Sequence, residues 1–440
     1  MMNMAEDKFA TFTLEKIQLM PDSSSHLCIY KAPNFLRQVN EECYRPYFVS
    51  IGPLYYGLAL LEPMQYHKLR CLKFILELDC NPYRSNLEHY MRIIREMEGR
   101  VRDCYAEMIT LPSNVFNKMI LVDSMFIIFL FMTTPRMILP ASSREILDNM
   151  QKKNIITWEV KLRSDLFQLE NQVPLFVLEL LFDEVFGAAY PHTSFRELAL
   201  DYMTDRMPFL QGYQISEIIE ERIKNASDIA HLVDLLMMSC YPTTRRCEKI
   251  CWDFGYTYTN DRFPSVSNLR AAGVKFKASK KTNLMDITFS KGVLQIPPIT
   301  LWDTSESLYR NMILFEQSHI PLLGSSYIAD YMVFLDNLIK TPEDVQILVE
   351  RKIIDNGMGS DDAVVSLFSG ITIYVAMRKT FYYFDVRKAL NEHANTKWNN
   401  WKATLKKEYF GHPWATISVI YALILFILTL IQTIGTFTTK

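Results

Sequence analysis

The feature that most constrains this chain is an uncharged apolar run near its C-terminus. It begins at Trp414, ends at Ile434 and reads WATISVIYALILFILTLIQTI. As an α-helix it would be roughly 31 Å long, which matches the roughly 30 Å hydrocarbon core of a bilayer. The apolar runs of buried core helices are usually shorter, at about 10 to 14 residues. The run therefore predicts one transmembrane helix at residues 414–434, with the lipid bilayer as a partner.

The flanks of this run predict which side of the membrane the body occupies. The N-terminus, MMNMAEDKFATFTLEK, carries acids and lysines where a signal peptide needs a basic segment followed by an apolar one. Lys440 alone follows the run, whereas four lysines precede it: Lys397, Lys402, Lys406 and Lys407. Positive residues favour the cytosolic side. We therefore expect a single-pass protein of the plasma membrane or an endomembrane, with its body facing the cytosol.

Composition places the rest of the chain among globular proteins. Of its 440 residues, 49% are apolar and 22% are charged, which is a folded rather than a disordered mixture. The formal net charge of -2 gives no overall attraction to nucleic acid, so no nucleic-acid partner is expected. The eight cysteines form no C-x-x-C pair, which favours free and mostly buried thiols.

The spacing of apolar residues divides the body into two lobes. Helical spacing dominates up to residue 240, a stretch without period follows, and a period of two then appears in VKFKAS, LMDITFS and VLQIPPITLW. The predicted fold class is mainly α: a multi-helical cytosolic body with a small antiparallel β insertion and one C-terminal transmembrane helix. The predicted parts are a flexible N-terminal segment (1–27), a helical lobe (28–240), a long connecting loop (241–267), a second lobe (268–410) with the small sheet (274–302) before its helices, and the transmembrane helix (414–434).

A second apolar helix is predicted in the middle of the chain, at residues 116–132. Its sequence includes MILVDSMFIIFLFM, in which Asp123 interrupts the apolar run. An aspartate at the centre of a bilayer costs about 2.5–3.5 kcal/mol on insertion scales. We therefore expect this helix to be buried in the body rather than to cross a membrane.

No pattern of residues identifies a catalytic centre. The sequence lacks the G-x-S-x-G, H-E-x-x-H and G-x-x-x-x-G-K-[ST] motifs, which place a nucleophile, a metal ion or a phosphate. Cys240, Cys247, Cys251 and His231 could be drawn as a zinc site, but their spacings do not match the usual ligand pairs. We therefore predict no catalytic residue, no cofactor-binding residue, no metal ligand and no cofactor.

Two polar clusters have both a structural and a functional interpretation. Glu170, Asn171 and Gln172 stand before Pro174 and an apolar helix, where they could cap that helix and satisfy neighbouring backbone groups, or could form a site. The structural role is favoured. A basic string could bind phosphates or anionic lipid, or could cover an exposed sheet edge, which is the favoured use of lysines. The string consists of Lys275, Lys277, Lys280 and Lys281.

Several segments, taken together and in order, resemble the plant family called domain of unknown function 247. They include CIYKAPNFLRQVN, YRPYFVSIGPLYYG, DLFQLENQVPLFVLELLF, DITFSKGVLQIPPI and KKEYFGHPWATISVIYALILFILTLIQT, and the likeness runs from about residue 28 to residue 433. The resemblance implies a plant origin, a helical body and a C-terminal anchor, and it carries over no catalytic residue. Relatives usually have a histidine pair where this chain has Tyr55-Tyr56, and a glutamate where it has Gln65-Tyr66.

The resemblance also implies a class of function. Some relatives are implicated in grass self-incompatibility as pollen-side recognition factors. We therefore predict a membrane-anchored protein-recognition or scaffold module that binds a protein partner, and the sequence is compatible with a homo-oligomer or a hetero-oligomer. The alternative is an enzyme of unfamiliar mechanism at the membrane surface. A deep pocket with converging ionisable residues would favour the enzyme, and a broad apolar or aromatic surface patch would favour recognition.

Overall fold

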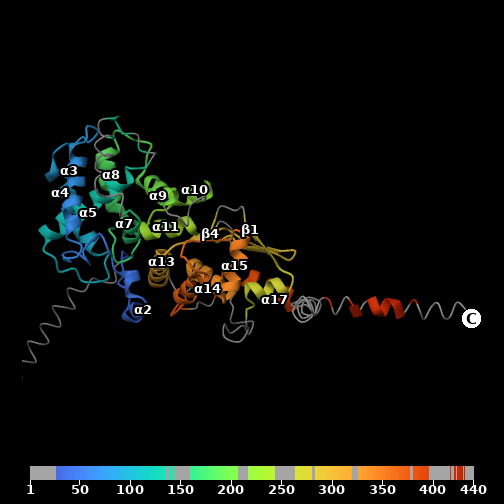
Figure 1. Ribbon diagram of the computed structural model, residues 1–440. Helices are drawn as coiled ribbons and strands as arrows, with labels where there is room; N and C mark the ends of the chain where they lie inside the picture. The colour runs from blue at the N-terminus through green and yellow to red at the C-terminus, as the bar shows by residue number, and fades with distance from the viewer. Residues whose placement is uncertain are drawn as a thin grey trace, which may run out of the picture.

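The computed structural model describes residues 26–134, 137, 139–141, 144, 159–206, 217–242, 263–279, 283–319, 326–376 and 380–395, with scattered positions between 417 and 431. Most of the predicted flexible segment (1–27) and of the predicted connecting loop (241–267) lies outside these residues. In the described part the chain is mainly helical, with two small sheets. Figure 1 shows the helices of the N-terminal half gathered on one side and the sheets and later helices on the other. Their buried apolar side chains form one continuous core.

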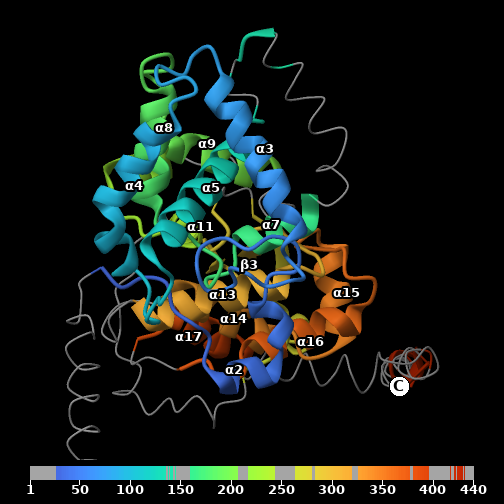
Figure 2. The ribbon, with the colours of Figure 1, turned by 90° about the vertical axis from the view of Figure 1, so that its left-hand side faces the viewer.

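Helix α5 (Ser113–Phe131) is the centre of the N-terminal group. Helices α3, α4, α8 and α9 all contact it, and in Figure 2 it lies between α3 and α4. A helix that is apolar on all its faces is stable in a folded protein only where other elements cover it. The other helices of this group are α3 (Pro63–Glu77), α4 (Leu87–Arg102), α7 (Glu159–Leu166), α8 (Leu175–Phe186), α9 (Phe195–Arg206), α10 (Glu217–Asn225) and α11 (Leu232–Cys240).

The prediction that residues 116–132 form a buried helix of the body is confirmed. Helix α5 is long and apolar enough to cross a membrane, but 83% of its apolar window is buried inside the protein. Its Asp123 forms an ion pair at 2.5 Å with Lys68 of α3, and both side chains are at most 1% exposed. Gly52 donates its backbone N–H to the same carboxylate at 2.9 Å. A buried charge needs such partners because its desolvation is costly.

The length, hydropathy and burial of the described helices also contradict the prediction of a C-terminal transmembrane helix. Among the described residues, the one helix long and apolar enough to cross a membrane is α5, in the middle of the chain. Most of residues 414–434 lie outside the described part. Length and hydropathy alone do not separate a helix covered by lipid from a helix covered by protein. The fold class that the structure supports is therefore a mainly helical protein with small sheets, and the described residues give no support to a C-terminal membrane anchor.

Helix α13 (Ser305–His319) takes the central place in the C-terminal group. It contacts α14, α16 and α11, and it also contacts the 3-10 helix η1 (Glu41–Tyr44), which lies near the start of the chain. The region around η1, here called the N-terminal segment (residues 28–57, separate from the predicted flexible segment 1–27), therefore packs beside the last third of the protein. The other helices involved are α2 (Asn34–Val39), α12 (Val266–Ala271), α14 (Tyr327–Leu338), α15 (Pro342–Glu350), α16 (Asp361–Ile371) and α17 (Phe384–Asn395).

Local signals in the sequence determine where two of these helices begin. Thr341 accepts a hydrogen bond from the N–H of Asp344, whose carboxylate in turn accepts one from the N–H of Thr341, so that a capping box opens α15. Pro342 then occupies the first turn, where its missing N–H has no partner to lose. Ser360 caps α16 by accepting from the N–H of Ala363.

The prediction of one antiparallel sheet is wrong in its pairing. β1 (Lys275–Ala278) runs parallel to β3 (Val293–Ile296), and only β2 (Thr288–Ser290) is antiparallel to β3. Pro297 and Pro298 follow β3 and cannot donate to a ladder. β4 (Ile299–Leu301) then leaves this sheet and pairs in parallel with β5 (Ile354–Asn356). A period of two identifies strands, whereas partner and direction depend on distant residues.

The buried ion pair of α3 and α5 gives a test of the fold. Lys68→Met leaves Asp123 charged and buried, so we expect it to lower the free energy of unfolding by about 3–5 kcal/mol. The double variant with Asp123→Asn should recover part of that loss, because asparagine still accepts from Gly52. Chemical denaturation measures both. Lys73→Met, at an exposed position of the same helix, is the control, and an equal effect of the two lysine variants would contradict the account.

Candidate functional site

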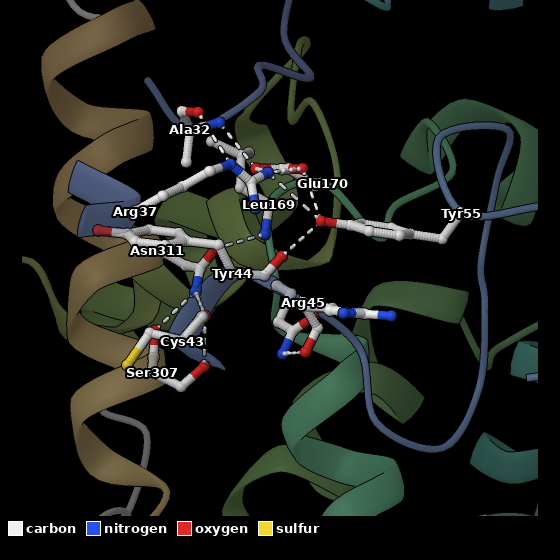
Figure 3. Close-up of polar contacts among 11 residues, drawn as sticks. Ala32, Arg37, Cys43, Tyr44, Arg45, Tyr55, Leu169, Glu170, Ser307 and Asn311 are labelled. Atoms are coloured by element: carbon white, nitrogen blue, oxygen red, sulfur yellow. Dashed lines mark hydrogen bonds and ion pairs between the residues drawn. The ribbon is translucent and has the colours of Figure 1, made fainter. Parts of the chain in front are cut away.

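The densest group of buried polar side chains in the described part lies at the end of α7 and in the loop that leads to α8, here together called the junction loop (residues 165–172). Figure 3 shows part of it, with Glu170 facing side chains from the N-terminal segment and the backbone of Leu169 facing Asn311 of α13. Buried backbone and side-chain polar groups must find partners, and a buried loop has no helix or ladder to supply them. The polar residues of the loop that are at most 1% exposed are Asp165, Gln168, Glu170, Asn171 and Gln172.

Glu170 joins the junction loop to the N-terminal segment. Its carboxylate accepts the backbone N–H of Ala32 at 2.7 Å, the guanidinium of Arg37 at 2.5 Å to both oxygens, and the hydroxyl of Tyr55 at 2.8 Å (Figure 3). Burial raises the pKa of Glu170, and the three donors act against that shift. Both oxygens are therefore occupied by the protein's own donors.

Asp165 and Asn171 hold a stretch of chain without secondary structure, here called the irregular segment (residues 47–52). Asp165 accepts the N–H groups of residues 47, 48 and 49 at 3.0, 2.6 and 2.9 Å. The Asn171 side chain accepts the N–H of residue 51 at 2.6 Å and donates to the carbonyl oxygens of residues 49 and 165. Side chains thus replace the neighbouring strand that would normally pair with this backbone.

Gly52 ends the irregular segment at a point where no other residue fits. Its φ is +73°, a conformation that L residues rarely adopt, and a Cβ would lie 2.5 Å from the carbonyl oxygen of Gln172. That carbonyl also accepts the hydroxyl of Tyr105 at 2.9 Å. The chain can therefore approach the junction loop this closely only through a glycine.

The structural interpretation of Glu170, Asn171 and Gln172 is confirmed in one of its two parts. All three satisfy backbone groups, and Gln172 donates to the carbonyl oxygens of residues 166, 168 and 171. They do not cap α8, because Pro174 occupies the N-cap position and no side chain bonds there. Three hydrogen-bonding residues precede this apolar helix because their side chains pair with buried backbone groups.

Asn311 ties the junction loop to α13. Its side chain accepts the N–H of Leu169 at 2.9 Å and donates to the carbonyl oxygens of Cys43 at 2.8 Å and Ser307 at 2.7 Å (Figure 3). Ser307 donates its hydroxyl to the same Cys43 oxygen at 2.8 Å. One amide side chain therefore connects the junction loop, η1 and α13.

Glu316, on the same helix, is also used by the backbone. Its carboxylate is fully buried and accepts the N–H groups of Ile328 and Ala329 at 3.0 and 2.9 Å, in the first turn of α14. The local N-cap residue, Ser326, makes no side-chain cap of its own. A carboxylate at this position complements the partial positive charge of the helix N-terminus.

His231 has a structural role instead of a role as a metal ligand. It is the N-cap of α11, where its Nδ1 accepts the N–H of Asp234 at 3.2 Å and its Nε2 lies 3.1 Å from the carbonyl oxygen of Cys28. Burial lowers the pKa of His231 to about 3. Cys247 and Cys251 lie outside the described residues, and in the described part no group of three acid, histidine or cysteine side chains could hold a metal.

Comparison with known proteins confirms the family that the sequence resembles. A family model described as a plant protein of unknown function, domain of unknown function 247, matches residues 29–428. The chain belongs to this plant family. It is 27% identical to the UPF0481 protein At3g47200 of Arabidopsis thaliana, with 92% of the chain and 85% of that relative covered. It is 21% identical to the putative UPF0481 protein At3g02645 of the same plant, with 92% and 89% covered. No solved structure matches it.

Sequence reasoning missed most partners of the junction. Lys68 was not identified from the sequence, although Asp123 inside an apolar helix signals that a buried cation must face it. Arg37 and Asn311 give no local signal, because each meets the junction loop from more than 100 positions away. The hydroxyl of Tyr55 completes the contacts of Glu170.

Asn171→Ala tests whether the junction is structural. It removes the side-chain partner of the N–H of residue 51 and of the carbonyl oxygen of residue 49, so we expect a loss of about 1–3 kcal/mol in the free energy of unfolding. Urea denaturation measures it. Asn34→Ala, at an exposed position, is the matched control. Loss of a partner or an activity with unchanged unfolding would instead make the junction a functional site.

The buried His231 predicts a dependence of stability on pH. Its pKa falls from 6.5 to about 3 on folding, so below pH 6.5 the unfolded state binds a proton that the folded state does not. Its contribution is therefore present above pH 6.5 and lost as the pH falls. His231→Asn keeps a cap acceptor and does not titrate. We expect the stability difference between wild type and variant to change by about 1 kcal/mol per pH unit between pH 6 and 4, in favour of the variant.

Urea denaturation at several pH values measures this difference. Burial raises the pKa of the neighbouring Asp234 to about 6, and that group is present in both proteins, so its titration largely cancels in the comparison. A difference that stays constant with pH would show that His231 does not lose its proton affinity on folding.

Proposed function

We propose that this protein is a recognition or scaffold module that binds a protein partner through an exposed aromatic patch. The patch consists of Phe35 on α2 and of Ile373 and Tyr374 after α16, which are 48%, 43% and 62% exposed. The rings of Phe35 and Tyr374 meet edge to face with centroids 5.4 Å apart. Aromatic residues in exposed clusters are typical of the centres of protein interfaces.

The backbone of Tyr374 is the observation that carries this proposal. Its φ is +63°, in the left-handed region. A bulky residue in such a conformation costs about 1–3 kcal/mol, and such residues cluster at functional sites. Burial does not offset the cost here, because most of the side chain is exposed. A binding surface that needs the ring outside gives a physical reason for the strain.

The size of the adjoining hollow favours a protein partner over a small molecule. The hollow measures about 20 Å³, whereas sites for small ligands usually enclose about 300–1,000 Å³. Its walls include Leu36, Ile313 and Leu314 beside Tyr374. The tip of one partner side chain fits there. Tyr44 also lines it, so the patch lies directly on the elements that the junction holds.

The buried carboxylates argue against an enzyme centred on the junction. The oxygens of Glu170, Asp165 and Glu316 accept hydrogen bonds from the protein's own backbone and side chains. A general acid or base must instead reach a substrate. Recognition is also the class of function that the family resemblance implies, and pollen self-incompatibility is one setting for such a partner.

Tyr374→Gly separates binding from folding. Glycine adopts a φ of +63° without strain, so we expect the variant to melt no lower than wild type. Proteins cross-linked to the full chain in pollen and leaf extracts are identified by mass spectrometry. The affinity of each purified candidate is then measured. We expect Tyr374→Gly and Phe35→Ala each to lower the affinity for the true partner at least about tenfold.

Tyr66→Ala is the matched control, because it removes an equally exposed tyrosine from α3. It should leave the affinity unchanged. The assignment of the patch would be overturned by a partner that binds wild type and Tyr374→Gly with equal affinity. It would also be overturned if Tyr66→Ala lowered the affinity as much as Tyr374→Gly does.

A further inference from the structure

A second surface lies where β1 forms the edge of the three-stranded sheet. The strand order is β1-β3-β2, so among the described residues β1 has a neighbouring strand on one side only. A cavity of about 660 Å³ lies along it, between the ends of α12 and α15. This volume is within the range of about 300–1,000 Å³ that ligand sites usually enclose, so the cavity is large enough to hold side chains of a bound molecule. The cavity and the aromatic patch share no residue, so they are separate surfaces.

Among the described residues, four cations and no acid line the cavity. Arg270 comes from α12, Lys275 and Lys277 from β1, and Arg351 from the end of α15. All four are exposed, and within the described part of the chain none of them forms an ion pair. Apolar side chains complete the lining, among them Phe276. Unpaired like charges around a hollow attract an anionic occupant.

The backbone of β1 is ready to pair with a further strand. In its parallel ladder with β3, Lys275 and Ser279 donate their N–H groups to the carbonyl oxygens of Gly292 and Ile296. Alternate residues of a strand point their backbone groups to opposite sides, so those of Phe276 point away from β3. No hydrogen bond reaches the outward N–H and C=O of Phe276 from any described residue.

These observations lead beyond the sequence prediction that lysines merely cover a sheet edge. Lys275 and Lys277 do lie exposed on an edge strand, as predicted, and Lys280 and Lys281 lie outside the described residues. Lysines on an edge repel another basic edge, but they do not repel an acidic one. Arg270 and Arg351, on two flanking helices, add charges that protecting the edge does not require.

We propose that the β1 edge binds an extended, acidic peptide segment of another protein by strand addition. The outward groups of β1 supply main-chain hydrogen bonds, and the four cations select carboxylates on the bound strand. The segment pairs over the length of β1 and lays its acidic side chains against the cavity. A phosphate ion or an anionic lipid headgroup would use the same cations but not the strand edge, and this difference makes the proposal testable.

The test uses the full-length chain and a fluorescent peptide of alternating glutamate and valine, with binding read by fluorescence anisotropy. Two matched peptides accompany it: one has lysine in place of glutamate, and the other carries N-methyl groups on the amides that face β1. We expect the lysine peptide not to bind. The N-methylated peptide keeps every charge and loses the strand hydrogen bonds, so we expect it to bind at least about tenfold more weakly.

Charge reversal on the protein supplies the second arm. Lys277→Glu and Arg351→Glu change exposed side chains. Each should lower the affinity for the glutamate peptide at least about fivefold without lowering the melting temperature. Lys73→Glu, at an exposed position of α3, is the control and should change nothing. Both cavity variants should leave binding at the aromatic patch unaltered, so failure of one proposal is distinguishable from failure of the other.

Several results would overturn the proposal. They are no binding of the glutamate peptide up to about 1 mM, equal binding of its N-methylated form, or no effect of the two cavity variants. Inorganic phosphate and phosphatidylserine vesicles are tested alongside. If either binds in a way that Lys277→Glu abolishes while the N-methyl groups make no difference to the peptide, the cavity is an anion or membrane site and not a strand acceptor.

Discussion

The structure depends on the way the junction loop replaces a missing strand. Asp165 and Asn171 accept four of the N–H groups in the irregular segment, and Asp123 accepts a fifth from Gly52. Without these side chains a buried stretch of backbone would have no partners, which costs about 1–3 kcal/mol for each unsatisfied group. Glu170 and Asn311 extend the same network to the N-terminal segment and to α13. The two helical groups of the molecule are joined through it.

The buried polar groups and the exposed groups of the molecule have different roles. The described carboxylates of the junction point inward and are used by the protein itself, so they hold the fold. The two features that we propose for partner binding face outward: the aromatic patch around Tyr374 and the basic edge of β1. The patch is supported by α2, α13 and the turn after α16, and α2 is held by the contact of Arg37 with Glu170. Under the proposed function, this rigid buried network would hold the recognition surface in one conformation.

Sequence reasoning succeeded where the signal was local and failed where the partner was distant. Asp123 inside an apolar helix predicted burial, because the cost of an unpaired charge in a bilayer follows from the sequence of that helix alone. The parallel pairing of β1 with β3 could not be read from the period of two. The apolar run at residues 414–434 was overinterpreted for a related reason, since hydropathy does not say what covers a helix. In the candidate site Glu170 was recognisable, whereas Arg37 and Asn311 were not.

The most direct test of this account is native-state hydrogen exchange of the backbone amides in the irregular segment. In an ordinary surface loop these amides would exchange by local opening that costs almost no free energy. Because buried side chains hold them, the amides of residues 47–49, 51 and 52 should exchange only through global unfolding, with an opening free energy equal to the stability of the whole protein. Exchange at the rate of a free loop would contradict the claim that the junction loop organises this fold.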